Sequence, residues 1–154
     1  NIYADAVTQT QDADGHQVHI FYAKNIKASA NTVTATFSAA NNHPWMAVFE
    51  YSGLSTTAPL DRTAHAQGSS TAPNTGPTTT TSSANELVFA GIGLPASYTG
   101  TTTAGSGFTL LQQNTTTSRA GAEARVVAAT GAYSGTFTLN IAANWSAAIA
   151  TFKP

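Results

Sequence analysis

The sequence contains no cysteine. This absence excludes disulfide bonds, thiolate metal sites and a cysteine nucleophile. It does not argue against an extracellular location, because a domain of 154 residues can bury enough surface to fold without cross-links. The length is that of one ordinary domain and the sequence shows no internal repeat, so we predict a single domain over residues 1–154.

Charged residues are scarce as well, at 8% of the chain against about 25% in a typical globular protein. The six lysines and arginines are scattered, and the formal net charge is −1. Without a basic stripe the chain cannot neutralise a phosphate backbone, so the sequence predicts no nucleic-acid partner. Threonine, serine, asparagine and glycine fill the polar positions. An uncharged polar surface of this kind is typical of secreted or cell-surface proteins, and we predict that location.

A long apolar run is also missing. No stretch approaches the roughly 20 residues needed to cross a bilayer as a helix, so we predict no membrane span. The chain begins with Asn1 rather than methionine. We therefore expect a processed or excised segment of a longer protein.

Apolar residues alternate with polar ones, or come in short runs between turn residues, in nearly every part of the chain. A period of two is the signature of strands, and helical periodicity is almost absent. Asp14-Gly15 suits a tight turn, so the first two strands should form a hairpin. We predict strands near 2–10, 16–24, 32–38, 45–52, 77–82, 86–93, 107–113, 122–130, 135–141 and 145–153.

The runs at 45–52 and 86–93 are apolar on both faces, which favours central strands. Residues 53–85 are the longest irregular stretch, and we interpret them as an ordered excursion over the sheet. The fold class predicted is all-β: an antiparallel β-sandwich of two sheets with about nine or ten strands. The strand count and the missing Cys–Trp–Cys pattern favour a jelly-roll-like arrangement over an immunoglobulin fold.

Several short motifs occur in order along most of the chain. They are FYAKNI (21–26), NTVTATF (31–37), EYSGL (50–54) with PLD (59–61), TTSSANELVF (80–89), GSGFT (105–109) and TGAYS (130–134). Together they resemble a widespread module of secreted bacterial proteins, often found beside immunoglobulin-like and fibronectin-like domains. The resemblance implies a β-sandwich of unsettled activity, with no catalytic residues to carry over. It also implies further strands before Asn1-Ile2-Tyr3, so we expect an exposed sheet edge that a neighbouring chain can fill.

Catalytic machinery is hard to find in these residues. Glycoside hydrolysis needs two carboxylates facing each other, for which Glu50 and Glu123 are the candidates. The alternative is a structural ion pair of Glu50 or Glu123 with Arg125 or Lys24. Gly105-Ser106-Gly107 lacks the strand-turn-helix context of a nucleophile elbow. We therefore predict that the protein is not an enzyme.

Metal ligands are equally sparse. Asp12-Ala13-Asp14-Gly15 begins like a calcium loop but lacks the later acidic ligands, and a plain turn explains it as well. His16 and His19 should point to opposite faces of one strand, while His43 and His65 are expected in loops. We predict no cofactor. A structural calcium held by backbone carbonyls and Asp61 would leave no signature in the sequence.

Four aromatic residues are the candidate ligand-binding residues. Sugars stack on exposed aromatic rings, and aromatics in loops are better placed for this than aromatics within strands. The alternative is that each ring anchors its own loop to the core. The candidates are Trp45, Tyr98, Tyr133 and Trp145.

These observations support one leading hypothesis and two alternatives. The leading one is a non-catalytic extracellular binding or adhesion module whose partner is a glycan or another cell-surface polymer. The first alternative is a structural subunit of a surface fibre or sheath, which self-associates through an exposed sheet edge. The second is an enzyme acting on polysaccharide, which the missing acid–base pair disfavours.

Overall fold

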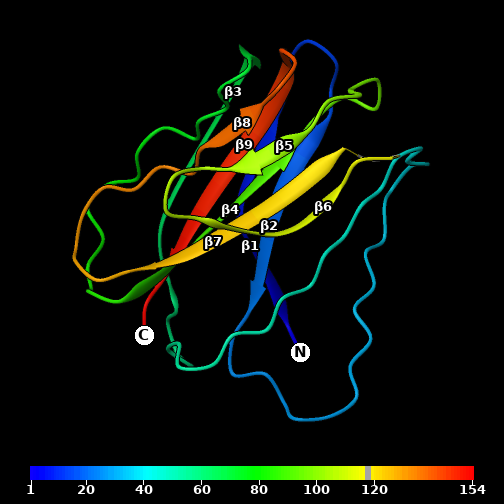
Figure 1. The fold of residues 1–154 in the computed structure, drawn as a ribbon. Helices are drawn as coiled ribbons and strands as arrows, with labels where there is room; N and C mark the ends of the chain where they lie inside the picture. Colours follow the sequence, from blue (N-terminus) through cyan, green and yellow to red (C-terminus); the bar gives the residue numbers. More distant parts are fainter. Residues whose placement is uncertain (117–118) are drawn as a thin grey trace.

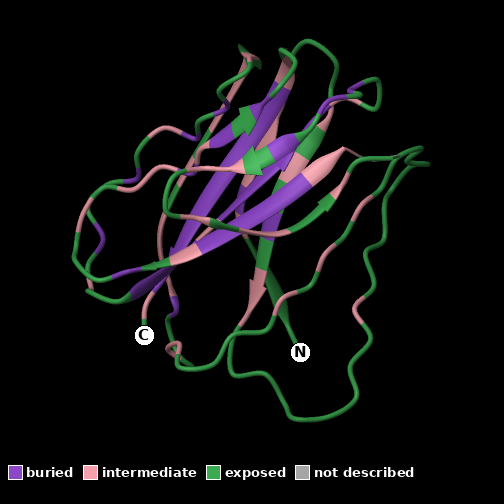
Figure 2. Ribbon diagram, in the orientation of Figure 1, coloured by how far each residue is buried: buried purple, intermediate pink, exposed green. Residues whose placement is uncertain are grey.

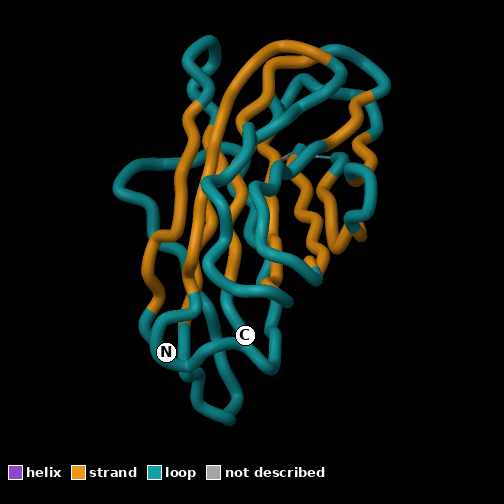
Figure 3. The backbone as a smooth tube through the Cα atoms, turned by 90° about the vertical axis from the view of Figure 1, so that its left-hand side faces the viewer, coloured by secondary structure: helices purple, strands orange, loops and turns teal. Residues whose placement is uncertain are grey.

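Strands are the only regular elements in the described part of this chain. The computed structural model describes residues 1–116 and 119–154. All strand pairs are antiparallel, and Figure 3 shows no helix. The predicted all-β, antiparallel fold is confirmed. The strands are β1 (Tyr3–Thr10), β2 (Gln17–Ala23), β3 (Leu60–Ser70), β4 (Glu86–Gly93), β5 (Thr102–Ala104), β6 (Thr109–Asn114), β7 (Ala120–Val127), β8 (Phe137–Leu139) and β9 (Ala143–Phe152).

A five-stranded sheet forms the centre of the molecule, in the order β3-β9-β4-β7-β6 (Figure 1). β4 and β9 lie next to each other inside this sheet and are buried along almost their whole length (Figure 2). Successive side chains of a strand point to opposite faces, so a strand covered on both sides needs a continuous apolar run. The central position predicted for residues 86–93 is confirmed.

Each face of the sheet has its own core. On one face Val88, Ile92 and Ile149 pack with Phe137 and Leu139 of β8, which pairs with β5. The opposite face packs Leu87, Ala148 and Ala150 against Val7 and Ile20 of the β1–β2 hairpin. The molecule is thus a β-sandwich in which short two-stranded sheets cover the two faces of the large one.

The β1–β2 hairpin turns where the sequence predicts it. Gln11 donates to the carbonyl of His16 at 2.9 Å, and Gly15 donates back to the carbonyl of Gln11 at 2.8 Å. Gly15 has φ of +76°, which glycine adopts without a steric cost. The turn residues therefore set the register that directs Val7 and Ile20 into the core.

The largest correction concerns residues 24–59, which we call the arm. The arm contains no strand, so the strands predicted at 32–38 and 45–52 are wrong. In Figure 1 it leaves β2, runs far out from the sheets and returns to β3. Pro59 is its only buried residue. The alternating pattern is present, but no described strand lies in register beside it, and a strand exists only when a neighbour pairs with its backbone.

A second correction concerns β3, which lies inside the stretch 53–85 predicted to be irregular. Its inward residues are small, with Ala64 and Ala66 packed against the core, so its alternation is weak in the sequence. Gly68 pairs with Trp145 of β9, whose ring covers it. A Cβ at Gly68 would lie 2.6 Å from Cζ2 of Trp145. The indole ring of Trp145 therefore fits here because Gly68 has no side chain. His65, which was predicted to lie in a loop, lies on this strand.

A third correction concerns residues 71–85, which we call the threonine segment. No strand forms at 77–82. Instead, three buried threonines fasten the segment to residues 131–135. Each donates its backbone N–H to a carbonyl and accepts, at Oγ1, the N–H of that same residue. The pairs are Thr75 with Gly135, Thr78 with Tyr133 and Thr81 with Gly131, at N···O distances of 2.9 to 3.1 Å.

The spacing of these contacts explains why the strand prediction failed. The threonines are three residues apart, whereas their partners are two apart. In a strand, side chains three residues apart point to opposite faces. The three threonine hydroxyl groups could then not all reach the same neighbour. Here the threonine Oγ1 atoms accept N–H groups that backbone carbonyls would accept in a β-ladder. The buried N–H groups are therefore satisfied without a strand.

Within the described residues no helix is long and apolar enough to cross a membrane.

Candidate functional site

Glu123 is the most deeply buried acidic residue among the candidates, with an exposed fraction of 0%. Its Oε2 accepts the N–H of Gly105 at 2.8 Å, and its Oε1 accepts the N–H of Thr136 at 3.2 Å. Burial raises its pKa to about 7, although the two N–H donors and the charge of Arg125 act against that shift. The carboxyl group thus ties two loops to β7.

Neither candidate catalytic glutamate forms the expected ion pair in the described part of the chain. Arg125 instead places its guanidinium 4.4 Å from the ring centre of Phe108 and 5.4 Å from that of Tyr133. Such cation–π contacts hold a cation against a ring face. Glu50 is exposed in the arm, whereas Glu123 is sealed from solvent and so cannot touch a substrate.

A second pair of carboxyl groups lies where β3 and β4 begin. Glu86 is buried and accepts the N–H of Ser83 at 3.1 Å. Burial raises the pKa of Glu86, and its neighbour Asp61 adds to the rise. Burial would raise the pKa of Asp61 too, but hydrogen bonds from Ser82, at 2.6 and 2.7 Å, hold it below its usual value. Asp61 therefore ties the start of β3 to Ser82, shortly before β4.

Two of the four candidate aromatics belong to the core. Tyr98 is 5% exposed and Trp145 is 7% exposed. The Tyr98 hydroxyl donates to the carbonyl of Thr101 at 2.7 Å, and Nε1 of Trp145 donates to Oγ of Ser70 at 3.0 Å. Rings so covered expose little surface for stacking, although Tyr98 contributes to the lining of a shallow hollow. Their positions favour the anchoring alternative over ligand binding.

The other two aromatics are half-buried. Tyr133 donates its hydroxyl to the carbonyl of Ala129, and its ring lies under Arg125. Trp45 lies in the arm between exposed neighbours. The structure does not bring the four candidates together into one site, and a binding role for Trp45 and Tyr133 stays a prediction.

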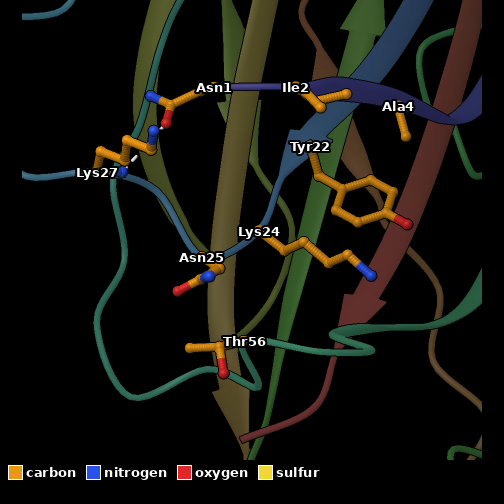
Figure 4. A pocket seen from close by; sticks show the side chains of 8 residues that line it. All are labelled: Asn1, Ile2, Ala4, Tyr22, Lys24, Asn25, Lys27 and Thr56. Carbon is orange, nitrogen blue, oxygen red and sulfur yellow. Dashed lines mark hydrogen bonds between the residues drawn. The ribbon is translucent and has the colours of Figure 1, made fainter.

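The hairpin-end pocket lies where the chain leaves β2 (Figure 4) and has a volume of about 480 Å³. Its wall is apolar at Ile2, Ala4 and Tyr22. Cationic and amide groups surround that wall: Lys24 donates to the carbonyl of Thr57, and the N–H of Lys27 donates to Oδ1 of Asn1 at 3.1 Å. The full lining is Asn1, Ile2, Ala4, Tyr22, Lys24, Asn25, Lys27 and Thr56.

Charge sets the chemistry of this pocket. Both lysine side chains are exposed, and neither forms an ion pair in the described residues. The ring of Tyr22 packs on Phe152 at 5.8 Å between centres, which fixes its place in the wall. An apolar wall with two ammonium groups and two amides suits a hydroxylated ligand that carries a negative charge.

A shallower hollow of about 440 Å³ lies at the opposite end of the hairpin, beside the Asp14-Gly15 turn. Its polar groups are hydroxyls with one amide and one carboxylate. Asn144 donates to Asp14 at 3.3 Å, and His16 contacts the same carboxylate. Burial would raise the pKa of Asp14, but the hydrogen bonds from Asn144 and from the backbone N–H of His16 hold that pKa below its usual value. We call this the loop-end hollow; it is lined by Asp14, Ser69, Pro95, Ser97, Tyr98, Thr99, Ile141, Ala142, Ala143 and Asn144.

The four histidines are dispersed. His16 bonds the carbonyl of Gly93 at 3.0 Å, and His19 bonds Oγ1 of Thr8 at 2.7 Å. His65 contacts Gln9, and His43 is exposed in the arm. The described residues contain no group of three or more histidine or acidic side chains placed to hold a metal ion.

Sequence reasoning named Lys24 only as an ion-pair partner of a glutamate and gave Lys27 no role. The signal available was their spacing beside Tyr22, but only the fold shows that Ala4 of β1, with Ile2 just before it, completes the wall. Comparison of the chain with protein-family models, with curated proteins and with solved structures finds no match in any of the three.

Proposed function

We propose that this protein is a non-catalytic extracellular binding module whose ligand is an acidic glycan, held in the hairpin-end pocket. The observation that carries the proposal is the pairing of an aromatic wall, Tyr22, with two exposed lysines that lack carboxylate partners in the described chain. Sugar rings pack on apolar surfaces through their C–H faces, while uronate or sulfate groups form charge-assisted hydrogen bonds with ammonium groups.

The rest of the surface supports a binding role over catalysis. Glu123 and Glu86 are buried and bonded to backbone N–H groups, so they serve the fold. Glu50 is exposed in the arm, and the described residues contain no group of three or more acidic or histidine side chains placed to act together on a metal ion. A scarcity of charge elsewhere also makes the two lysines stand out as a local positive field, which steers an anionic polymer to this end of the molecule.

The test compares polyuronates and sulfated polysaccharides with neutral glucans. We expect the wild-type chain to bind the acidic polymers, with affinity that falls steeply between low salt and about 0.5 M salt. The double variant Lys24→Gln, Lys27→Gln should weaken this binding at least about tenfold. Asn144→Ala, in the loop-end hollow, is the matched control and should leave binding unchanged.

Two results would contradict the proposal. One is the absence of binding to any acidic polymer in the panel. The other is binding that the lysine double variant leaves intact while Asn144→Ala abolishes it, which would move the site to the loop-end hollow. Circular dichroism of both variants checks that the fold is preserved, and the exposure of both lysines makes that the expected outcome.

A further inference from the structure

Exposed apolar side chains gather in the arm. Ten large hydrophobic residues are exposed among those the structure describes, and half of them lie between residues 24 and 59. A monomeric surface seldom shows so many in one segment without a partner. The five are Ile26, Phe37, Met46, Val48 and Tyr51.

Residues 45–50 have the burial alternation of a strand. Trp45, Ala47 and Phe49 are half-buried, whereas Met46 and Val48, which alternate with them, are 50% and 54% exposed. The inner row contacts the central sheet at Phe49, whose ring lies 5.6 Å from that of Phe89 at an angle of 55°. A period of two with one face packed on a sheet is what a strand in a second layer shows.

The backbone of this segment nevertheless lacks the partner that such a strand requires. No described residue forms a ladder with residues 45–51, and the sheet of β1 and β2 contains only those two strands. The N–H and C=O groups along this stretch are therefore a template for pairing.

We propose that residues 45–51 pair, antiparallel, with the same segment of a second copy of this protein. Antiparallel strands are related by a two-fold axis, so a strand of this kind is complementary to itself and one patch serves both copies. The paired strands would place the Met46 and Val48 side chains of both copies on one shared face. The apolar area that each copy now exposes would be covered by the other.

The low charge of this segment is a second reason to propose another copy of this protein as its partner. No Asp, Glu, Lys or Arg occurs from Ala28 to Phe49, and Glu50 is the one charged residue in the paired segment. A pairing centred on Val48 sets Glu50 opposite Met46 of the other copy, so like charges do not face each other directly. Natural edge strands are usually protected by charges or proline. The β3 edge of the central sheet follows that rule with Asp61 and Arg62, whereas the stretch 45–49 carries no such protection. This surface is independent of the hairpin-end pocket.

Disulfide trapping tests the pairing directly, because a chain without cysteine can cross-link only through cysteines that are introduced. Single variants Met46→Cys, Val48→Cys and Glu50→Cys, alone and as equimolar mixtures, sample the registers around the two-fold axis. Opposed residues of antiparallel strands are about 4.5 to 5.5 Å apart at Cα, within the range of a disulfide. We expect a covalent dimer from at least one variant or mixture. Ile141→Cys, an exposed apolar position outside the arm, should give none.

Sedimentation velocity over a concentration series supplies the second measurement. The wild-type chain should form a dimer, and Met46→Lys with Val48→Lys should raise the dissociation constant at least about tenfold, because a charge on an edge opposes pairing. Ile141→Lys should leave it unchanged. A wild-type chain that stays monomeric overturns the proposal. The partner of residues 45–51 would then be a strand of another protein. A dimer that none of the arm cysteines traps overturns it as well, because the copies then meet elsewhere.

Discussion

Two long segments of this chain, the arm and the threonine segment, contain no strand, yet their burial differs sharply, and the threonine segment alone of the two has a β-bridge, from Asn74 to Thr136. The threonine segment has Thr75, Thr78 and Thr81 buried and their N–H groups satisfied. The arm has one buried residue, Pro59, and residues 45–51 have no described backbone partner. Threonine occurs in both, at 6 of the 15 residues of the threonine segment and at 5 of the 36 residues of the arm. The two segments also differ in whether their hydroxyl groups meet backbone N–H groups at a spacing that the neighbour can match.

Hydrogen exchange should show the largest difference between the two segments. The amides of Thr75, Thr78 and Thr81 are buried donors and should exchange at least about a thousandfold more slowly than those of residues 45–51, which is about 4 kcal/mol of local opening free energy. The measurement is native-state exchange followed by NMR in dilute protein. Equal rates would show that the threonine contacts are not held in solution. Protection of residues 45–51 that appears only at high concentration would link the arm to the pairing proposed above.

The pH dependence of stability should also distinguish the buried core from the exposed arm. Burial raises the pKa of Glu123 from its ordinary value of 4.5 to about 7. Its carboxyl group binds a proton more tightly in the folded state, so its contribution is complete below about pH 4.5. That contribution is lost as the pH rises to about 7, and the difference amounts to about 3 kcal/mol.

Urea unfolding between pH 5 and pH 8 measures this effect. Glu123→Gln leaves one oxygen for two N–H donors, so it should destabilise most at pH 5 and flatten the profile toward pH 8. Glu50→Gln in the exposed arm is the matched control and should change stability by less than about 0.5 kcal/mol. If the free energy of unfolding depended on pH in the same way for Glu123→Gln and for the wild-type protein, the pH dependence could not come from the raised pKa of Glu123.

Removing a single hydroxyl group should have the next largest effect. Thr75→Val keeps the shape of the side chain but leaves the N–H of Gly135 without its acceptor at 3.0 Å, at a cost of about 1 to 3 kcal/mol. Thr34→Val in the exposed arm removes the same group and should cost less than about 0.5 kcal/mol. Thermal unfolding of the two variants side by side provides the comparison. If the two variants lost the same amount of stability, the hydrogen bonds of Thr75 would add nothing beyond the difference in conformational preference between threonine and valine.

The sequence was a good guide wherever a strand's neighbours are close in sequence or strongly apolar. The hairpin followed from Asp14-Gly15, and β4 followed from its continuous apolar run. β3 was missed because alanines and Gly68 give a weak alternation, and its strand state depends on β9, far along the chain. Local pattern cannot reveal a partner that distant.

The arm shows the opposite error. Residues 32–38 and 45–52 have the alternation of strands, but pairing depends on a neighbour, and pattern alone does not guarantee one. The prediction of aromatic binding residues was limited in the same way. Tyr98 and Trp145 sit beside loops in sequence, yet Thr101 and Ser70 bind their polar ends and draw the rings inward. The hairpin-end pocket needed two strands to be aligned before its wall could be seen.

The smallest effect we expect comes from the one ring contact that joins the arm to the central sheet. Phe49 and Phe89 are both half-buried, so each alanine substitution also loses contacts with other groups. A double-mutant cycle of Phe49→Ala and Phe89→Ala removes those separate losses and isolates the pair. Tilted aromatic pairs couple by about 0.5 to 1.5 kcal/mol, and a partly solvated pair belongs at the lower end of that range. Urea unfolding at one low protein concentration measures the coupling without a contribution from association. A coupling of zero would mean that residues 45–51 leave the sheet in solution, and the arm would then be held near its ends, where the N–H of Lys27 donates to Asn1 and the N–H of Ser55 donates to the carbonyl of Lys153.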